Sequence, residues 1–135
     1  MNRFVDARFR GKDVRLTFTN NVLLSSQDVF EESLGEILDH KGKKQEERIL
    51  WLFSAMSYAG AEIWKEQGFK GIAISELAHI YPIEYTQICT FVMRAIDLGL
   101  KQEIVPEEVD LGLLELKKKR TTKSLEQNGT ERLND

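Results

Sequence analysis

Cysteine and histidine are almost absent from this chain. Its 135 residues include one cysteine, Cys89, and two histidines, His40 and His79. A single cysteine excludes an internal disulfide framework and fits a protein kept in a reducing compartment. These three side chains are also too few for a typical structural zinc site. We therefore predict neither a metal nor a cofactor.

Long hydrophobic stretches and a strong charge of one sign are also missing. No apolar run approaches the roughly 18 residues of a transmembrane helix, and the N-terminus lacks the apolar stretch of a secretory signal peptide. The formal net charge of −3 argues against nucleic-acid binding through overall charge. We expect a small cytoplasmic protein with no membrane or nucleic-acid partner.

The motifs of common enzyme classes are absent as well. The sequence has no glycine-rich phosphate loop, no nucleophile elbow and no cluster of metal ligands. The acidic pairs Glu31-Glu32 and Glu46-Glu47 consist of neighbours, whose side chains point in different directions on a helix. Cys89 is expected either in the core or at its boundary. The sequence therefore predicts no catalytic residue and a protein that is not an enzyme.

The first structured segment predicted from the pattern is a β-hairpin over 1–19. Apolar and polar residues alternate on both sides of Gly11, as they do in two half-buried strands joined by a turn. An isolated hairpin is marginal in water, so it must pack on the rest of the chain. Its core face is expected to consist of Val14, Leu16 and Phe18.

Helical periodicity dominates the next segments. We predict a helix over about 26–39 with Ser25 or Ser26 as its N-cap. After a linker at 41–44, a long helix over 45–66 is apolar around much of its circumference, which is typical of a central helix.

Two further helices are predicted before residue 100. A short one over 76–81 is expected to have Ser75 as its cap. Pro82 suits the first turn of the next helix, and Gly99 suits the position just after its end.

These elements predict an α+β fold that is mostly α-helical, with an N-terminal β-hairpin packed on a bundle of about four helices. We expect one globular domain over 1–116, made of the hairpin, a helical core over 26–100 and either one more short helix or a docking segment over 105–116. Residues 117–135 contain few apolar side chains and are predicted to be a disordered basic and polar tail.

One alternative function comes from the stretch between Ile74 and Leu100. Its short helix, turn and longer helix resemble a winged helix-turn-helix, in which the second helix lies in the major groove of DNA. That helix would begin near Glu84, which repels phosphates, and Arg94 would be its one basic residue. The basic run at 117–123 is interpreted either as a patch for nucleic acid or a membrane surface, or as a solvated flexible tail.

The order of features also resembles the tail assembly chaperones of long-tailed bacteriophages and prophages. The similar stretch runs from Phe9 to Leu100. It contains the hairpin sequence GKDVRLTF at 11–18, the acidic segment FEESLG at 30–35, the apolar helix LWLFSAMSYAG at 50–60, and ISELA at 74–78.

This resemblance implies a non-enzymatic chaperone in the cytoplasm of a bacterial host. A tape-measure protein exposes apolar helical faces until the tail tube closes around it, and reversible covering by many small domains suppresses aggregation. The implied partners are the tape-measure protein and the tail-tube protein, and the chain is expected to self-associate. A longer product made by ribosomal frameshifting near the lysine run at 117–119 is also implied.

The same resemblance implies an apolar groove that takes an amphipathic helix. The groove is expected on the exposed flank of the helix over 45–66 and on its neighbours. Aromatic residues at this spacing are otherwise read as core. The candidate partner-binding residues are Leu50, Trp51, Tyr58 and Trp64, with Phe30 and Leu34 as secondary candidates.

Overall fold

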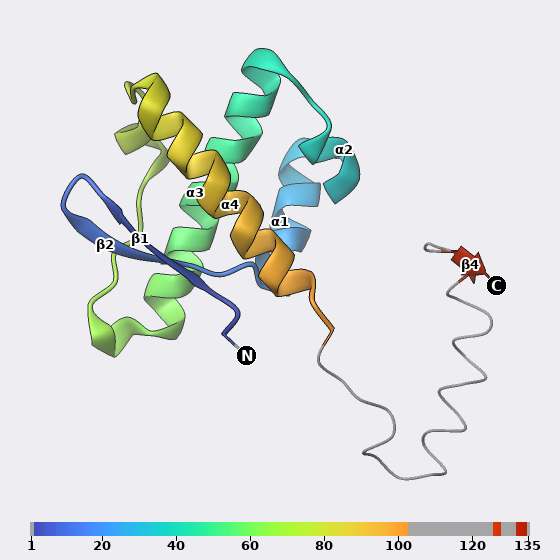
Figure 1. Ribbon diagram of the computed structural model, residues 1–135, viewed down its shortest axis with the longest axis horizontal. Helices are drawn as coiled ribbons and strands as arrows, with labels where there is room; N and C mark the ends of the chain where they lie inside the picture. The colour runs from blue at the N-terminus through green and yellow to red at the C-terminus, as the bar shows by residue number, and fades with distance from the viewer. Residues whose placement is uncertain (1, 103–125, 128–131, 135) are drawn as a thin grey trace, which may run out of the picture. The chain divides into compact units, whose positions relative to one another are not determined.

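The computed structural model describes residues 2–102, 126–127 and 132–134 (Figure 1). The chain divides into two units, Met1–Lys101 and Gln102–Asp135. In the second unit, strands β3 (Glu126–Gln127) and β4 (Arg132–Asn134) pair in antiparallel fashion. The helix or docking segment predicted over 105–116 lies outside the described residues, as does most of the tail predicted over 117–135.

The first unit begins with the predicted hairpin. Strand β1 (Val5–Phe9) pairs antiparallel with β2 (Lys12–Leu16). The turn residues Arg10 and Gly11 have φ angles of 48° and 85°, as in the type I′ turn that matches the twist of a two-residue hairpin. The predicted core face is confirmed, since it consists of the buried residues Val14, Leu16 and Phe18.

The single helix predicted over 26–39 is wrong, because two helices occupy this part of the chain. Helix α1 (Asn20–Phe30) begins earlier than expected. Its N-cap is Thr19, whose side-chain oxygen accepts a hydrogen bond from the Val22 N–H at 3.3 Å. Ser26, one of the predicted caps, lies buried inside the helix instead.

A left-handed residue separates the two helices. Glu31 has a φ of 55° and ends α1. Ser33 then starts α2 (Leu34–Leu38) through a capping box, in which its hydroxyl accepts from the Glu36 N–H and the Glu36 carboxylate accepts from the Ser33 N–H. Strong local caps therefore override the continuous apolar stripe that predicted one helix.

The long helix is present with shifted ends. Helix α3 (Gly42–Ile63) includes most of the segment predicted to be a linker. It ends where Trp64 leaves the helical conformation, and a 3₁₀ turn, η1 (Lys65–Gln67), follows. Gly68, with a φ of 82°, then reverses the chain.

The helix predicted over 76–81 is instead a single 3₁₀ turn, η2 (Ile74–Leu77). The Glu76 carboxylate accepts a hydrogen bond from the Ala73 N–H at 3.0 Å, so the cap is not Ser75. Helix α4 (Pro82–Leu100) starts at the proline, as predicted. Gly99 lies inside this helix and does not follow it.

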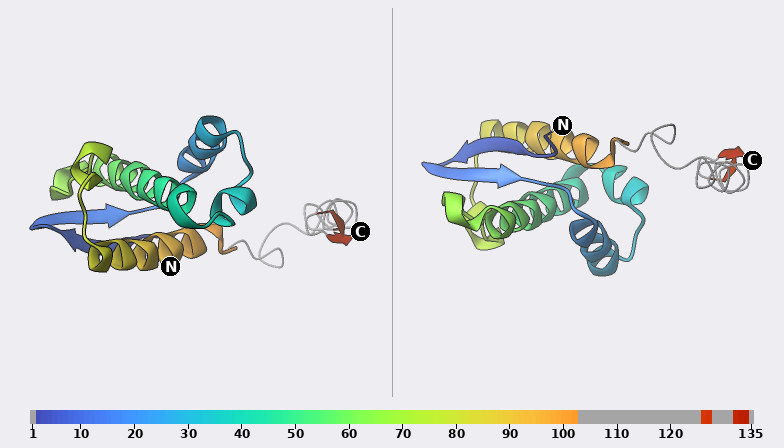
Figure 2. Two further views of the ribbon diagram at one scale, coloured as in Figure 1. Left: turned by 90° about the horizontal axis from the view of Figure 1, so that it is seen from above. Right: turned by 90° about the horizontal axis from the view of Figure 1, so that it is seen from below.

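Helix α3 is the centre of the first unit. It contacts β2, α1, α2, η1, η2 and α4. In both views of Figure 2 the hairpin appears between α3 and α4, and α1 appears on the opposite side of α3 from α4. The largest fully buried side chains include Phe53, Leu52 and Met56 of this helix. The α+β, mostly helical fold class is thus confirmed.

Candidate protein-binding groove

An open groove runs between α1 and α3. Its volume is about 410 Å³. From α1 and its cap it is lined by Thr19, Asn21, Val22 and Ser25; from α3 it is lined by Trp51, Ala55, Tyr58, Ala59, Glu62 and Ile63. These α3 positions recur at spacings of three and four, which places them on one face of the helix.

The small side chains of α3 shape the groove. Ala55 and Ala59 are one turn apart, and their small side chains leave space between the larger side chains of Trp51 and Ile63. Ile63 is 54% exposed and Tyr58 is 51% exposed, so apolar surface remains accessible. A concave apolar surface beside a short helix has the form of the grooves that accept amphipathic helices.

The wall at Trp51 is supported by packing and charge. The Phe30 and Trp51 rings meet edge to face with their centroids 5.7 Å apart. The Arg48 guanidinium lies 4.5 Å from the centre of the Phe30 ring. Glu32 accepts hydrogen bonds from Arg48 Nε at 2.9 Å and is 2.7 Å from His40 Nε2. The hydrogen bond from Arg48 has the largest effect and the contact with His40 the next largest, and both lower the pKa of the Glu32 carboxyl.

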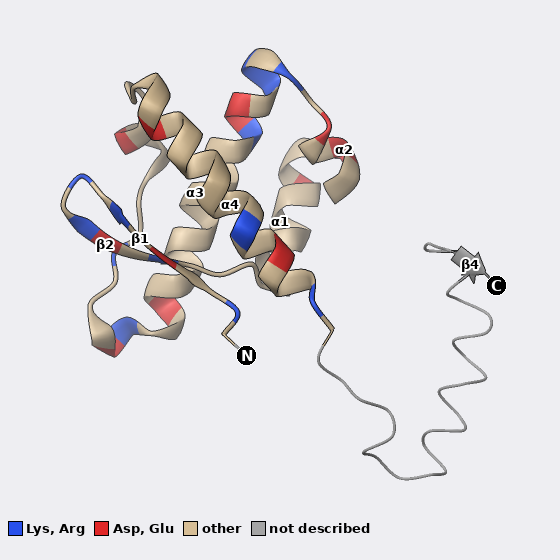
Figure 3. Ribbon diagram, viewed as in Figure 1, with Lys and Arg blue, Asp and Glu red and all other residues tan. Residues whose placement is uncertain are grey.

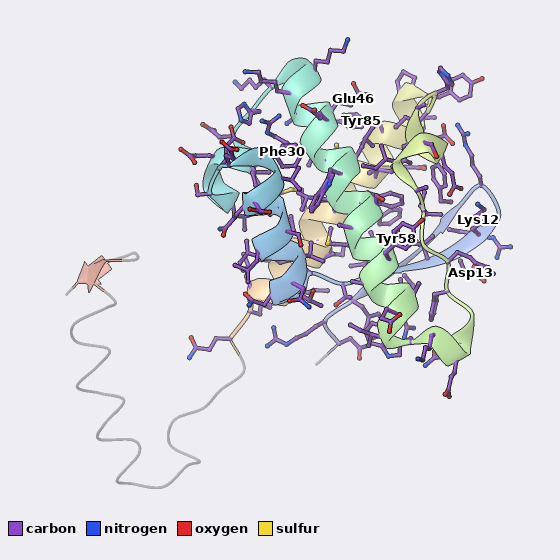
Figure 4. All side chains as sticks on the ribbon, turned by 180° about the vertical axis from the view of Figure 1, so that it is seen from behind. Lys12, Asp13, Phe30, Glu46, Tyr58 and Tyr85 are labelled. Atoms are coloured by element: carbon purple, nitrogen blue, oxygen red, sulfur yellow. The ribbon has the colours of Figure 1, made fainter. Side chains whose placement is uncertain are left out.

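Tyr58 lies on α3 about two turns after Trp51. Its ring lies on the backbone of Gly71, where an added Cβ would be only 2.3 Å from the nearest ring atom. Figure 4 shows Tyr58 beside the chain that follows η1, and Phe30 on the side of α1. The contact with Gly71 thereby fixes the side of the groove on which the Tyr58 ring lies.

Charge is sparse around the groove. Between Arg48 and Glu62, α3 has no charged residue, and α1 has only Asp28. Figure 3 shows charged residues at the hairpin, at the beginning of α3, and at its end with η1. Glu62 is the one charged side chain among those that line the groove.

The structure brings together some of the predicted residues and separates others. Trp51 and Tyr58 line the groove, and Phe30 contacts Trp51. Leu34 is half-buried against the core. Leu50 lies in a separate hollow with Lys43, Lys44, Glu46 and Glu47.

Trp64 lies in a different cluster, outside the groove. Its ring is 5.1 Å from that of Phe4, edge to face, and Arg15 lies 5.0 Å from its centre. Arg15 also lies over Phe4 and Phe69 and forms two hydrogen bonds with Asp6, at 2.7 and 2.9 Å. Trp64 therefore covers the outer face of the hairpin.

Sequence reasoning missed four apolar residues of the groove, which are Val22, Ala55, Ala59 and Ile63. The pair Ala55 and Ala59 was visible as small residues one turn apart. Phe30 of α1 was a secondary candidate, but Val22 was missed because the predicted helix began six residues too late, at 26 instead of 20.

Comparison with known proteins gives no family. No protein-family model, no curated protein and no solved structure matches this chain. Its site is therefore interpreted from geometry. None of the helices in the described part is long and apolar enough to span a membrane.

No three His, Cys, Asp or Glu side chains in the described part of the chain are grouped so that they could hold a metal ion. His79 is exposed and Cys89 is half-buried. Tyr85 has a hydroxyl that is buried without a hydrogen-bond partner in the described residues, and burial raises its pKa, with Cys89 and Glu46 adding to the effect. The two labelled residues Glu46 and Tyr85 lie near each other in Figure 4.

The segment of the DNA-binding alternative has a different local structure from that expected. The first helix of the motif is the four-residue turn η2. At the start of α4, Glu84 is bound by Arg10 of the hairpin. DNA binding stays an untested prediction.

The Arg10–Glu84 ion pair predicts a loss of stability in acid. Hydrogen bonds from Arg10, at 2.7 and 2.8 Å, and from the Tyr81 N–H lower the pKa of Glu84 from its ordinary 4.5 to about 2. Because the unfolded chain binds the proton more tightly, this stabilisation is complete above pH 4.5 and is lost as the pH falls towards 2.

Urea unfolding at pH 7, 4 and 2 measures this effect. In Glu84→Gln the decrease in unfolding free energy between pH 7 and pH 2 should be smaller than in the original chain. An equal decrease in both proteins would contradict the role of this ion pair. Asp97→Asn is a matched control, since Asp97 is exposed and its contact with Lys101 is 3.8 Å long.

Proposed function

We propose that this chain is a non-enzymatic protein-binding module whose α1–α3 groove takes an apolar helix of a partner protein. The observation that carries the proposal is the exposed apolar groove with small residues along its floor and a single charge at its edge. Exposed apolar surface of this kind is typical of interaction sites on small proteins.

Combined with the sequence resemblance, the proposal becomes more specific. The bound helix would belong to the tape-measure protein of a long-tailed bacteriophage, and the chain would act as a tail assembly chaperone that also recruits tail-tube subunits. Binding of the chaperone to apolar helices would shift the tape-measure protein toward its unaggregated state. This shift increases as the concentration of free chaperone rises above the Kd.

The test is the capture of helical tape-measure segments by purified protein. Trp64→Phe leaves Trp51 as the single tryptophan, so its fluorescence reports on the groove. We expect a blue shift on binding, because the bound helix removes water from the indole ring. In this background Tyr58→Asp should weaken binding by about tenfold or more, since a charge would be placed in the apolar contact.

A matched control separates the groove from general surface hydrophobicity. Ile83 on α4 is 64% exposed and is not among the groove residues. Ile83→Asp should leave the affinity unchanged. Equal binding by the folded Tyr58→Asp variant would refute the assignment of the groove. Retention of duplex DNA that weakens with salt would instead favour the DNA-binding alternative.

A further inference from the structure

We propose that the helix bound in the α1–α3 groove has a lysine or arginine beside its apolar stripe and that this cation pairs with Glu62. The inference rests on the proposed function, because it assumes that a helix occupies the groove. It adds the chemistry and the spacing that the partner must have.

Glu62 is suited to meet a charge from a partner. It is exposed and lies at the edge of the groove, in the last turn of α3. No ion pair of the described residues includes it, although neighbouring elements contain several such pairs. Its carboxylate is therefore free to pair with a bound molecule.

The end of α3 adds to the negative potential at this point. The last turn of α3 contains no basic residue, and the carbonyl end of the helix dipole lies there. No other charged side chain lines the groove. A cation in the bound helix would meet both the carboxylate and the dipole, whereas an anion would be repelled by both.

The position of Glu62 also sets a spacing. Glu62 follows Trp51 by eleven positions on one helix, which corresponds to about 16 Å along the axis. A bound helix that places an apolar side chain against Trp51 must therefore have its basic residue about three turns away. Between these two ends, Ala55 and Ala59 leave room for large apolar side chains.

Two synthetic peptides test this inference. Both are amphipathic 18-residue helices with a leucine stripe, and they differ only in having lysine or glutamate beside the stripe, about eleven residues from its first leucine. Each is titrated into the Trp64→Phe protein with Trp51 fluorescence as the readout. At low salt the lysine peptide should bind about 3- to 10-fold more tightly, and the preference should fade in 0.5 M NaCl.

A charge reversal provides the decisive comparison. Glu62→Lys should invert the preference, so that the glutamate peptide binds more tightly. Asp97→Lys makes the same change in charge at an exposed residue of α4 outside the groove and should leave the preference as it was.

The outcomes separate this inference from the proposed function. If both peptides bind equally to the original protein and to Glu62→Lys, while Tyr58→Asp abolishes binding, the groove stands and the pairing with Glu62 is overturned. If binding is insensitive to Tyr58→Asp, the groove itself is wrong and the proposed function fails with it.

Discussion

Replacing Gly60 by alanine is expected to destabilise the protein by about 3 kcal/mol. A Cβ at this position would lie 1.7 Å from the carbonyl oxygen of Arg15 and 2.8 Å from its carbonyl carbon. Both atoms belong to the backbone of β2, so no side-chain rotation relieves the overlap. The helix and the strand would have to move apart, and the close packing of the core would be lost along their contact.

The sign of this effect is opposite to that expected from helix propensity. Gly60 lies inside α3, and alanine in place of glycine within a helix is otherwise stabilising by about 0.5–1 kcal/mol. Gly35 in α2 is the matched control, because it is exposed and the nearest atom to an added Cβ is 4.0 Å away. Urea unfolding followed by circular dichroism should show a loss for Gly60→Ala and a small gain for Gly35→Ala. A Gly60→Ala variant as stable as the original chain would show that α3 and β2 do not meet at this distance.

Replacing Ser57 by alanine should cost about 1–3 kcal/mol of unfolding free energy, because it removes the acceptor of a buried backbone N–H. The Ser57 hydroxyl accepts a hydrogen bond from the Ile72 N–H at 2.8 Å and donates to the Ser54 carbonyl oxygen at 2.7 Å. Both Ser57 and Ile72 are fully buried. Water cannot replace the lost acceptor without opening the core.

The same helix offers a control for this substitution. Ser54 is also buried, but its hydroxyl makes no hydrogen bond to the described residues. Ser54→Ala should therefore be neutral or slightly stabilising. Thermal unfolding of both variants measures the difference, and equal stabilities would argue against the Ser57–Ile72 bond. The loss in Ser57→Ala should also loosen Gly71, which adjoins Ile72 and supports the Tyr58 ring.

The sequence predicted correctly those elements in which a single hydrophobic periodicity, that of a strand or that of a helix, is dominant. The alternation around Gly11 predicted the hairpin, and the long apolar stretch predicted a central helix, which is α3. Pro82 correctly marked the start of α4, because proline lacks the N–H that a first helical turn leaves free.

Other parts of the chain depended on competition between signals of similar strength. The apolar stripe from Val29 to Leu38 favoured one helix, but the left-handed Glu31 and the Ser33 capping box divide it into α1 and α2. Gly99 matches the pattern of a residue after a helix, yet it continues α4, where a Cβ would be 2.6 Å from the carbonyl oxygen of Phe18. Glycine is required at position 99 by the close packing against Phe18, and not by the end of the helix.

The candidate site was predicted in part for the same reason. Trp51 and Tyr58 were expected in a groove on the flank of the long helix, and both line it. Trp64 is the second tryptophan and directly follows the last residue of α3, but Phe4 and Arg15 of the hairpin region cover it. Which aromatic residues of a helix remain accessible depends on contacts from segments far away in the sequence.

The sequence by itself determined the α+β class, the hairpin, the central helix and the absence of common catalytic motifs, because each of these depends on residue types and their spacing along the chain. Only the tertiary structure decided that α1 and α3 enclose the groove, that Gly60 and Gly99 are points of backbone contact, and that Glu62 stands alone at the edge of an uncharged surface. These features arise where separate elements meet, and the distances between such elements are set by the packing of the whole core and not by the local pattern.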